Sequence, residues 1–184
     1  MSSSIQQAVE VLREGGVIAY PTEAVYGLGC DPDNHAAIEK ILALKQRDKS
    51  KGLILIASEV ERLQPYLDEL PEDARHRVLA SWPGPFTWLW PARSTTSDWL
   101  RGEFDTLAVR VTAHPLAREL CQAFGKPLVS TSANLGGQPP ARSAAEVREQ
   151  FDGRLDFILE GKVGPHSSPT EIRDARSGDL IRGG

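Results

Sequence analysis

The chain has 184 residues, enough to bury a hydrophobic core without disulfide bonds. Hydrophobic residues make up 40% and charged residues 25%, which is typical of a folded protein and excludes a largely disordered chain. The net charge of −4 argues against a protein that holds a long nucleic acid by bulk charge, so an anion site has to be local. No apolar run approaches the ~20 residues of a membrane-spanning helix, and we expect no membrane partner.

Cysteine usage and the N-terminus predict the cellular location. Cys30 and Cys121 lie far apart in the sequence, which favours reduced thiols in a cytoplasmic protein. Residues 1–7 show no basic region leading into an apolar stretch, so the sequence predicts no secretory signal. We therefore expect a cytoplasmic protein.

The N-terminal part of the chain predicts helices and short strands in turn. Ile5, Ala8, Val9 and Leu12 recur at the spacing of one helix face, and the glycines at 15–16 can end that helix. The elements expected after it are a strand at 17–20, a loop at 22–29, a helix from about 34 to 45 and a fully buried strand at 53–57.

The remaining elements complete a mixed α/β pattern. We expect helices at 59–67, 72–81, 115–124 and 143–151, and strands at 86–90, 107–112, 127–131, 156–159, 170–173 and 180–182. The elements do not alternate strictly, so the sequence predicts a single domain, residues 1–184. Its fold class is α/β, an open, twisted, mixed parallel and antiparallel sheet flanked by helices.

An aromatic stripe lies within the predicted strand at 86–90. Phe86, Trp88 and Trp90 share one face of that strand because side chains alternate between faces. Such a stripe either packs in the core beneath a helix, which is the commoner case, or stacks nucleic-acid bases.

A cluster of cations precedes the strand at 53–57. Lys45, Arg47, Lys49 and Lys51 fall within seven residues, with Asp48 as the single acid among them. Arginine forks and lysine point charges are the usual ligands of phosphate oxygens. The alternative is a basic helix C-terminus, where cations complement the helix dipole.

Polar side chains also follow or interrupt other predicted strands, where open α/β sheets bind ligands. Thr22 and Glu23 follow the first strand, and the run at 130–134 (Ser-Thr-Ser-Ala-Asn) offers hydroxyls and an amide for phosphate or ribose, or else caps a turn. Arg110 interrupts an apolar strand and needs a negative partner there. Either a substrate carboxylate or a structural acid would serve.

Several other chemistries are poorly supported. The four histidines show no metal-ligand spacing, so we expect no protein metal site. The chain contains neither GxGxxG nor GxxxxGK[ST], and neither cysteine has a histidine near it in sequence.

Five stretches together carry a family resemblance. They are PTEAVYGLG (21–29), KQRDKSKGLIL (45–55), WPGPFTWLWPA (82–92), LAVRVTAHP (107–115) and PLVSTSANLGGQPP (127–140). The chain resembles the YrdC-like domain family, in particular its short bacterial threonylcarbamoyl-AMP synthases. The resemblance implies a YrdC-like fold with a basic concave face.

The resemblance also implies an activity, that of a nucleotidyltransferase in tRNA modification. L-Threonine, bicarbonate or CO2, and ATP would give L-threonylcarbamoyladenylate and pyrophosphate, with Mg²⁺ accompanying ATP. Partner proteins would then transfer the threonylcarbamoyl group to tRNA, which could itself contact the concave face. The alternative is a non-catalytic RNA-binding module that uses the same face.

Roles for individual residues follow from the resemblance. Lys45 and Arg47 are expected to be catalytic, and the residues expected to bind threonine are Thr22, Arg110 and Thr170. Those expected to bind ATP are Lys45, Arg47, Lys51, Ser130, Ser132, Asn134 and Arg182. The chain departs from the family pattern at Asp48, where proline is common, and at Glu171, where a hydroxyl residue is common.

Overall fold

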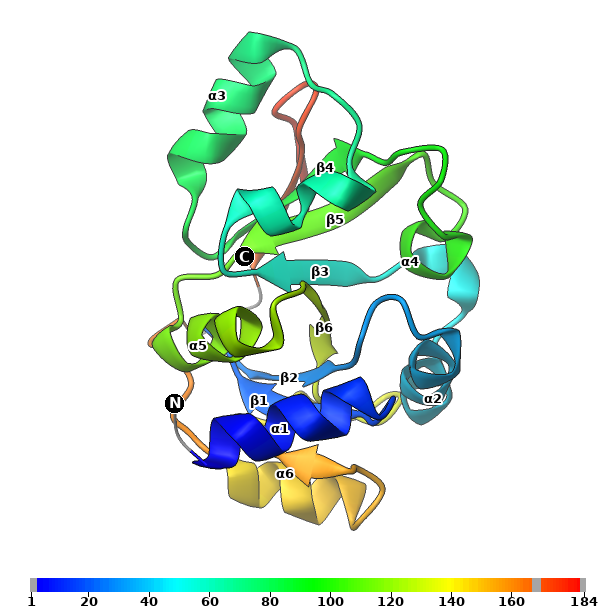
Figure 1. Ribbon diagram of the computed structural model, residues 1–184, viewed down its shortest axis with the longest axis vertical. Helices are drawn as coiled ribbons and strands as arrows, with labels where there is room; N and C mark the ends of the chain where they lie inside the picture. Colours follow the sequence, from blue (N-terminus) through cyan, green and yellow to red (C-terminus); the bar gives the residue numbers. More distant parts are fainter. Residues whose placement is uncertain (1–2, 167–169, 183–184) are drawn as a thin grey trace.

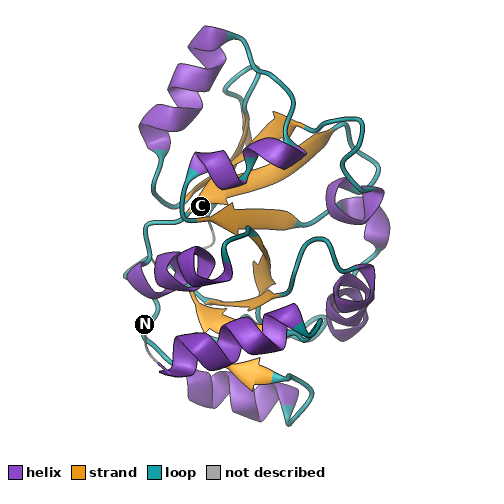
Figure 2. Ribbon diagram, viewed as in Figure 1, coloured by secondary structure: helices purple, strands orange, loops and turns teal. Residues whose placement is uncertain are grey.

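The computed structural model describes residues 3–166 and 170–182, and these contain the predicted mixed sheet. Nine strands are hydrogen-bonded in the order β7-β1-β2-β6-β3-β5-β4-β8-β9. The pairs β1–β7, β3–β5 and β4–β8 are parallel and the others antiparallel, which confirms an open mixed sheet. The strands form a twisted layer through the molecule with helices outside it (Figure 2).

The element bounds are as follows. The strands are β1 Ile18–Pro21, β2 Tyr26–Gly29, β3 Ile54–Ala57, β4 Phe86–Pro91, β5 Thr106–Val111, β6 Leu128–Ser132, β7 Phe157–Ile158, β8 Glu171–Asp174 and β9 Leu180–Arg182. The α-helices are α1 Ser3–Arg13, α2 His35–Lys45, α3 Glu72–Ser81, α4 Asp98–Arg101, α5 Pro115–Phe124 and α6 Ala144–Phe151. Three 3₁₀ turns are η1 Lys49–Lys51, η2 Val60–Arg62 and η3 Gln64–Tyr66.

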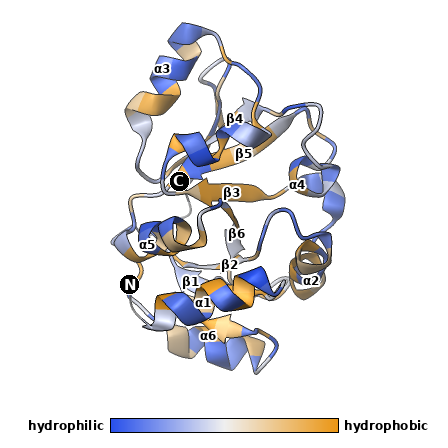
Figure 3. Ribbon diagram, in the orientation of Figure 1, coloured by the Kyte–Doolittle hydropathy of each residue, from blue (hydrophilic) through white to orange (hydrophobic). Residues whose placement is uncertain are grey.

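Both faces of the central strands are buried, because alternate side chains enter two separate hydrophobic clusters. In β3, Ile56 packs in the cluster formed with α1 and α5, whereas Leu55 and Ala57 pack in the larger cluster that includes α2 and α6. Helices α1 and α5 lie side by side over the sheet in Figure 1. Strand β3 is accordingly hydrophobic along its length, while the outer helix turns are hydrophilic (Figure 3).

Helix α2 brings Lys45, one of the predicted site residues, into place. The side chain of Asn34 accepts a hydrogen bond from the backbone N–H of Ala37 and so caps the start of the helix. The helix ends at Gln46, whose φ of 49° is left-handed, and this leaves Lys45 on the last turn. The sequence predicted both ends of this helix.

Three local predictions need correction. Residues 26–29 were expected to be a loop but form β2 between β1 and β6, which Gly29 permits because a Cβ there would lie 2.6 Å from the Tyr20 ring. The expected helix at 59–67 is instead the pair of 3₁₀ turns η2 and η3, interrupted by Pro65. Helix α4 was not expected.

The aromatic stripe and the cysteines belong to the core. Trp88 and Trp90 are buried, so core packing is the correct interpretation of the stripe. Cys30 and Cys121 are buried free thiols, and burial raises the pKa of each to about 12. Among the described residues, no helix is both long and apolar enough to span a membrane.

Candidate functional site

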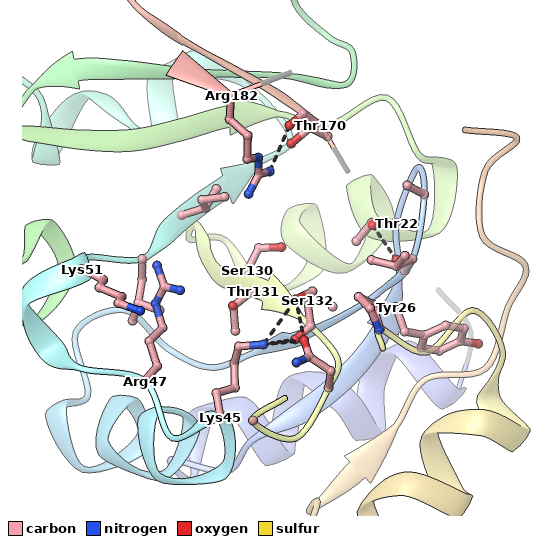
Figure 4. A pocket seen from close by; sticks show the side chains of 18 of the residues that line it. Thr22, Tyr26, Lys45, Arg47, Lys51, Ser130, Thr131, Ser132, Thr170 and Arg182 are labelled. Carbon is pink, nitrogen blue, oxygen red and sulfur yellow. Dashed lines mark hydrogen bonds between the residues drawn. The ribbon is translucent and has the colours of Figure 1, made fainter. Parts of the chain in front are cut away.

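One cavity of about 520 Å³ collects every residue to which the sequence assigned a site role. The ten residues come from six separate stretches of the chain, and Figure 4 shows most of them converging on the cavity from opposite sides. They are Thr22, Lys45, Arg47, Lys51, Arg110, Ser130, Ser132, Asn134, Thr170 and Arg182. Their common location is a finding, whereas their individual ligands remain predictions.

The cavity is strongly cationic. Five lysine and arginine side chains line it, and none of the described lining residues is Asp or Glu. Lys45 reaches it from α2, Lys51 from η1 and Arg47 from the segment between them. Arg110 reaches it from β5, and Arg182 from β9. Such a lining suits a ligand that carries several negative charges, as a polyphosphate does.

Lys45 is held by the chain segment at the end of β6. Its Nζ donates to the carbonyl oxygen of Ser132 at 2.7 Å and to Asn134 Oδ1 at 2.7 Å, with Ser132 Oγ at 3.3 Å. Ser132 Oγ also donates to Asn134 Oδ1 at 2.7 Å, which closes the group (Figure 4). The hydroxyl and amide that were expected to face a nucleotide thus also position the lysine.

Burial changes the acidity of this lysine. Desolvation, and then the charge of Arg47, lower the pKa of Lys45 to about 8. The ammonium is therefore mostly charged at neutral pH but loses its proton at mildly alkaline pH. A bound anion would favour the charged form again.

Arg47 has both a structural contact and a place in the cavity. Its Nε and Nη2 donate to the carbonyl oxygen of Gly52 at 3.2 and 3.0 Å, which fixes the loop that carries Lys51. Burial, and then the charge of Arg182, lower the pKa of Arg47. Both arginines line the same cavity, and guanidinium groups suit a ligand with several negative charges.

Asp48, which stands where the family pattern commonly has proline, has a structural role in this chain. Asp48 is exposed and caps η1, since its Oδ1 accepts from the backbone N–H of Ser50 at 2.8 Å. This hydrogen bond lowers the pKa of Asp48. Lys49 is directed to Asp98, at 3.1 Å, and lies over the Trp99 ring rather than in the cavity.

Arg110 has a structural acid as partner, one of the two alternatives that the sequence left open. Its Nη1 donates to Glu23 Oε1 at 2.5 Å, and both side chains are buried. Arg110 still lines the cavity, and its buried Nε has no hydrogen-bond partner among the described residues. The ion pair with Glu23 therefore leaves the Nε donor of the guanidinium without a hydrogen-bond partner among the described residues.

Thr22 lies in a tight turn beside this pair. Its Oγ1 donates to the carbonyl oxygen of Val25 at 2.6 Å. The hydroxyl proton is therefore engaged, and the oxygen offers its remaining lone pair to a donor in the cavity.

Thr170, which directly precedes β8, and Arg182 of β9 supply the opposite wall of the cavity. Arg182 Nη2 donates to the carbonyl oxygen of Thr170 at 2.9 Å, and Thr170 Oγ1 lies 3.1 Å from Thr87 Oγ1. The departure at Glu171 does not alter the lining, because Glu171 pairs with Arg173 outside the cavity.

The sequence reasoning missed part of the lining. Gly136 lies against the end of α2, where a Cβ would come within 2.8 Å of the carbonyl oxygen of Lys45, so only glycine fits. The signal was present as the glycine pair at 136–137, one residue after the polar run at 130–134. Other lining residues without an assigned role include Tyr26, Gln46 and Thr131.

Comparison with known proteins identifies the family. A family model for Sua5, YciO and YrdC proteins, described as "Telomere recombination", matches residues 10–184. The chain is 53% identical over 183 residues to the threonylcarbamoyl-AMP synthase of Vibrio campbellii, covering 98% of this chain and 99% of that one. It is 56% identical over 178 residues to that of Nitrosococcus oceani, covering 97% and 96%. The chain belongs to the Sua5/YciO/YrdC family.

Solved structures agree with this assignment. P. abyssi Sua5 complexed with L-threonine matches with a TM-score of 0.86 at 34% identity, over 92% of this chain and 50% of that one. E. coli YciO matches with a TM-score of 0.85 at 29% identity, over 98% and 88%. The chain therefore spans about half the length of the Sua5 protein that it resembles.

Proposed function

We propose that this protein is a threonylcarbamoyl-AMP synthase, which joins L-threonine, bicarbonate or CO2, and ATP to form L-threonylcarbamoyladenylate and pyrophosphate. The observation that carries the proposal is the convergence of ten predicted residues on one cavity with five cations and no acid in its described lining. Full-length relatives at 53–56% identity bear the name of this enzyme, which supports the same conclusion.

The chemistry needs charge and positioning more than a nucleophilic side chain. The threonine amine takes up CO2 and releases a proton to give a carbamate. A carbamate oxygen then attacks the α-phosphorus of ATP, the bond to the β-phosphate oxygen breaks, and pyrophosphate leaves. Fixed cations stabilise the charge that develops on the phosphoryl and leaving oxygens.

The cations divide between the two substrates in this proposal. Lys45, Arg47 and Lys51 hold the triphosphate, and Arg182 approaches it from the opposite wall. Lys45 and Arg47 also act in catalysis, because they remain in contact with the phosphates as pyrophosphate departs. Ser130, Ser132 and Asn134 complete the nucleotide site, the last two also by holding Lys45.

The threonine end of the cavity lies at β1 and β5. The donors of Arg110 that Glu23 does not engage take the carboxylate. Thr22 Oγ1, whose proton is already engaged with Val25, accepts a hydrogen bond from the amine or the hydroxyl of threonine. Thr170 contacts threonine from the opposite wall.

Magnesium would accompany the nucleotide rather than bind a protein site. No group of three or more His, Cys, Asp or Glu side chains among the described residues is placed to hold a metal ion. The cavity offers hydroxyl and amide oxygens, which are weak ligands compared with the phosphate oxygens of ATP.

The product would serve partner proteins that modify tRNA in the cytoplasm, with residues 1–184 acting as one domain. The proposal is tested by incubating the protein with ATP, bicarbonate and each of several amino acids, with released pyrophosphate as the measured product. We expect release that depends on threonine. Release independent of threonine, or none, would overturn the proposal.

A further inference from the structure

Glu23 is a buried acid that borders the cavity without lining it. Its Oε1 accepts from Arg110 Nη1 at 2.5 Å and from Thr112 Oγ1 at 2.9 Å. Its Oε2 accepts from the backbone N–H of Ala113 at 3.2 Å. The carboxylate is thus fixed by three donors from the end of β5, and it can influence a ligand only through Arg110 and through its charge.

This carboxylate makes the cavity electrostatically uneven. Among the described residues, Arg110 is the one lining cation that forms an ion pair with an acid. Arg47 and Arg182 donate instead to neutral carbonyl oxygens, and Lys45 to neutral oxygens of Ser132 and Asn134. One end of the cavity therefore carries uncompensated positive charge, and the other end has its charge balanced.

Arg110 nevertheless keeps hydrogen-bonding capacity. A guanidinium has several N–H donors in one plane, and Glu23 engages only Nη1. Holding one nitrogen restricts the position of the guanidinium, so Glu23 also limits the directions that the remaining donors can take. The buried Nε is one of these and has no partner among the described residues.

The two proposed substrates, ATP and threonine, differ in how much negative charge they would bring close to Glu23. A triphosphate carries several negative charges, and a phosphate placed on Arg110 would approach the fixed carboxylate of Glu23. Juxtaposed like charges disfavour the wrong ligand, which is a common source of specificity. An amino acid brings a single carboxylate and an adjacent amine, so the same position accepts it at little cost.

We propose that Glu23 is a positioning and specificity residue that reserves Arg110 for the amino acid and keeps phosphate groups at the Lys45 end. This inference rests on the proposed function, because it assigns the two ends of that active site. Glu23 acts through Arg110 and touches neither substrate.

Tripolyphosphate is the probe for the test. In the wild-type protein, we expect it to compete with ATP but to leave threonine binding unchanged. In Glu23→Gln, which removes the charge and keeps the size, we expect tripolyphosphate to compete with threonine as well. The KM for threonine should also rise about tenfold or more, because Arg110 loses a charged hydrogen-bond partner.

Two further variants separate the effect of the charge of Glu23 from the effect of its position. Glu23→Asp keeps the charge but draws it back from Arg110, so the KM for threonine should rise while phosphate remains excluded. Glu171→Gln removes an equal charge from the pair with Arg173, which does not line the cavity, and should behave as the wild type in both respects.

The outcomes distinguish this inference from the proposed function. If the wild-type protein releases pyrophosphate with threonine but folded Glu23→Gln shows the wild-type KM and no new competition, the inference is wrong. Competition between tripolyphosphate and threonine in the wild type would overturn it without any variant, as calorimetric titration of threonine with and without tripolyphosphate would show. Absence of threonine-dependent turnover in the wild type would instead refute the proposed function.

Discussion

The ammonium of Lys45 donates to Asn134 Oδ1 at 2.7 Å, joining residues 89 positions apart in the sequence. Lys45 ends α2 and Asn134 follows β6, so this contact exists only because β6 lies beside β3 in the centre of the sheet. Since Asn134 orients a half-buried cation, removing it should disturb the charge as well as the contact.

Asn134→Ala should weaken the binding of a non-hydrolysable ATP analogue about tenfold. A hydrogen bond to a charged group contributes roughly 1.5–3 kcal/mol, and this substitution removes one from Lys45. Calorimetric titration measures the change. An unaltered dissociation constant would mean that the backbone carbonyl of Ser132 suffices to hold the lysine.

The lowered pKa of Lys45, about 8, predicts proton uptake when nucleotide binds. A bound polyphosphate favours the charged ammonium and raises this pKa, so at about pH 8 the complex should bind more protons than the free protein. ATP affinity should fall as the pH rises through about 8. Titration in buffers of different ionisation enthalpy measures the uptake, and Lys45→Met, which cannot titrate, should abolish it.

Arg47→Ala should weaken binding of the same ATP analogue more than Lys49→Ala does. Arg47 lines the cavity and also fixes the loop carbonyl of Gly52, whereas Lys49 pairs with Asp98 away from the cavity. We expect a loss of roughly 1.5–3 kcal/mol for Arg47→Ala and almost none for Lys49→Ala. Equal affinities of the two variants would contradict the assignment.

Arg110→Met should lower the free energy of unfolding by roughly 3–5 kcal/mol, because it leaves the Glu23 carboxylate buried without its cation. Adding Glu23→Leu should restore part of this loss. Urea unfolding measures both variants. Arg176→Met, which removes the surface pairs with Asp105 and Asp174, is the control and should cost no more than about 1 kcal/mol.

The acid limb of the stability curve should depend on Glu23. Burial alone would raise the pKa of Glu23, but the charge of Arg110 and the hydrogen bonds to the carboxylate outweigh it and lower the pKa below 4.5. The stabilisation that the ionised Glu23 contributes is therefore present above about pH 4.5, and it is lost as the pH falls through the lowered pKa. Urea unfolding at a series of acidic pH values gives the free energy of unfolding as a function of pH. For Glu23→Gln, this free energy should change less with pH than it does for the wild type.

Residue types and local spacing were sufficient for much of the architecture, whereas the choice of individual site residues also needed the family resemblance. The helix from 35 to 45 was predictable because Asn34 caps it locally and its apolar residues share one face. The motifs at 45–51 and 130–134 were recognisable because phosphate chemistry needs cations and hydroxyls in those combinations.

The pairings within the site were decided by tertiary structure. Whether Arg110 meets a substrate or Glu23, and whether Ser132 faces solvent or Lys45, depends on the order of strands in the sheet. Strand β2 was missed for the same reason, since a short glycine-rich segment becomes a strand only when β1 and β6 supply partners on both sides. Contacts between residues almost 90 positions apart leave no local trace in the sequence, because their energies arise only when the sheet brings them together.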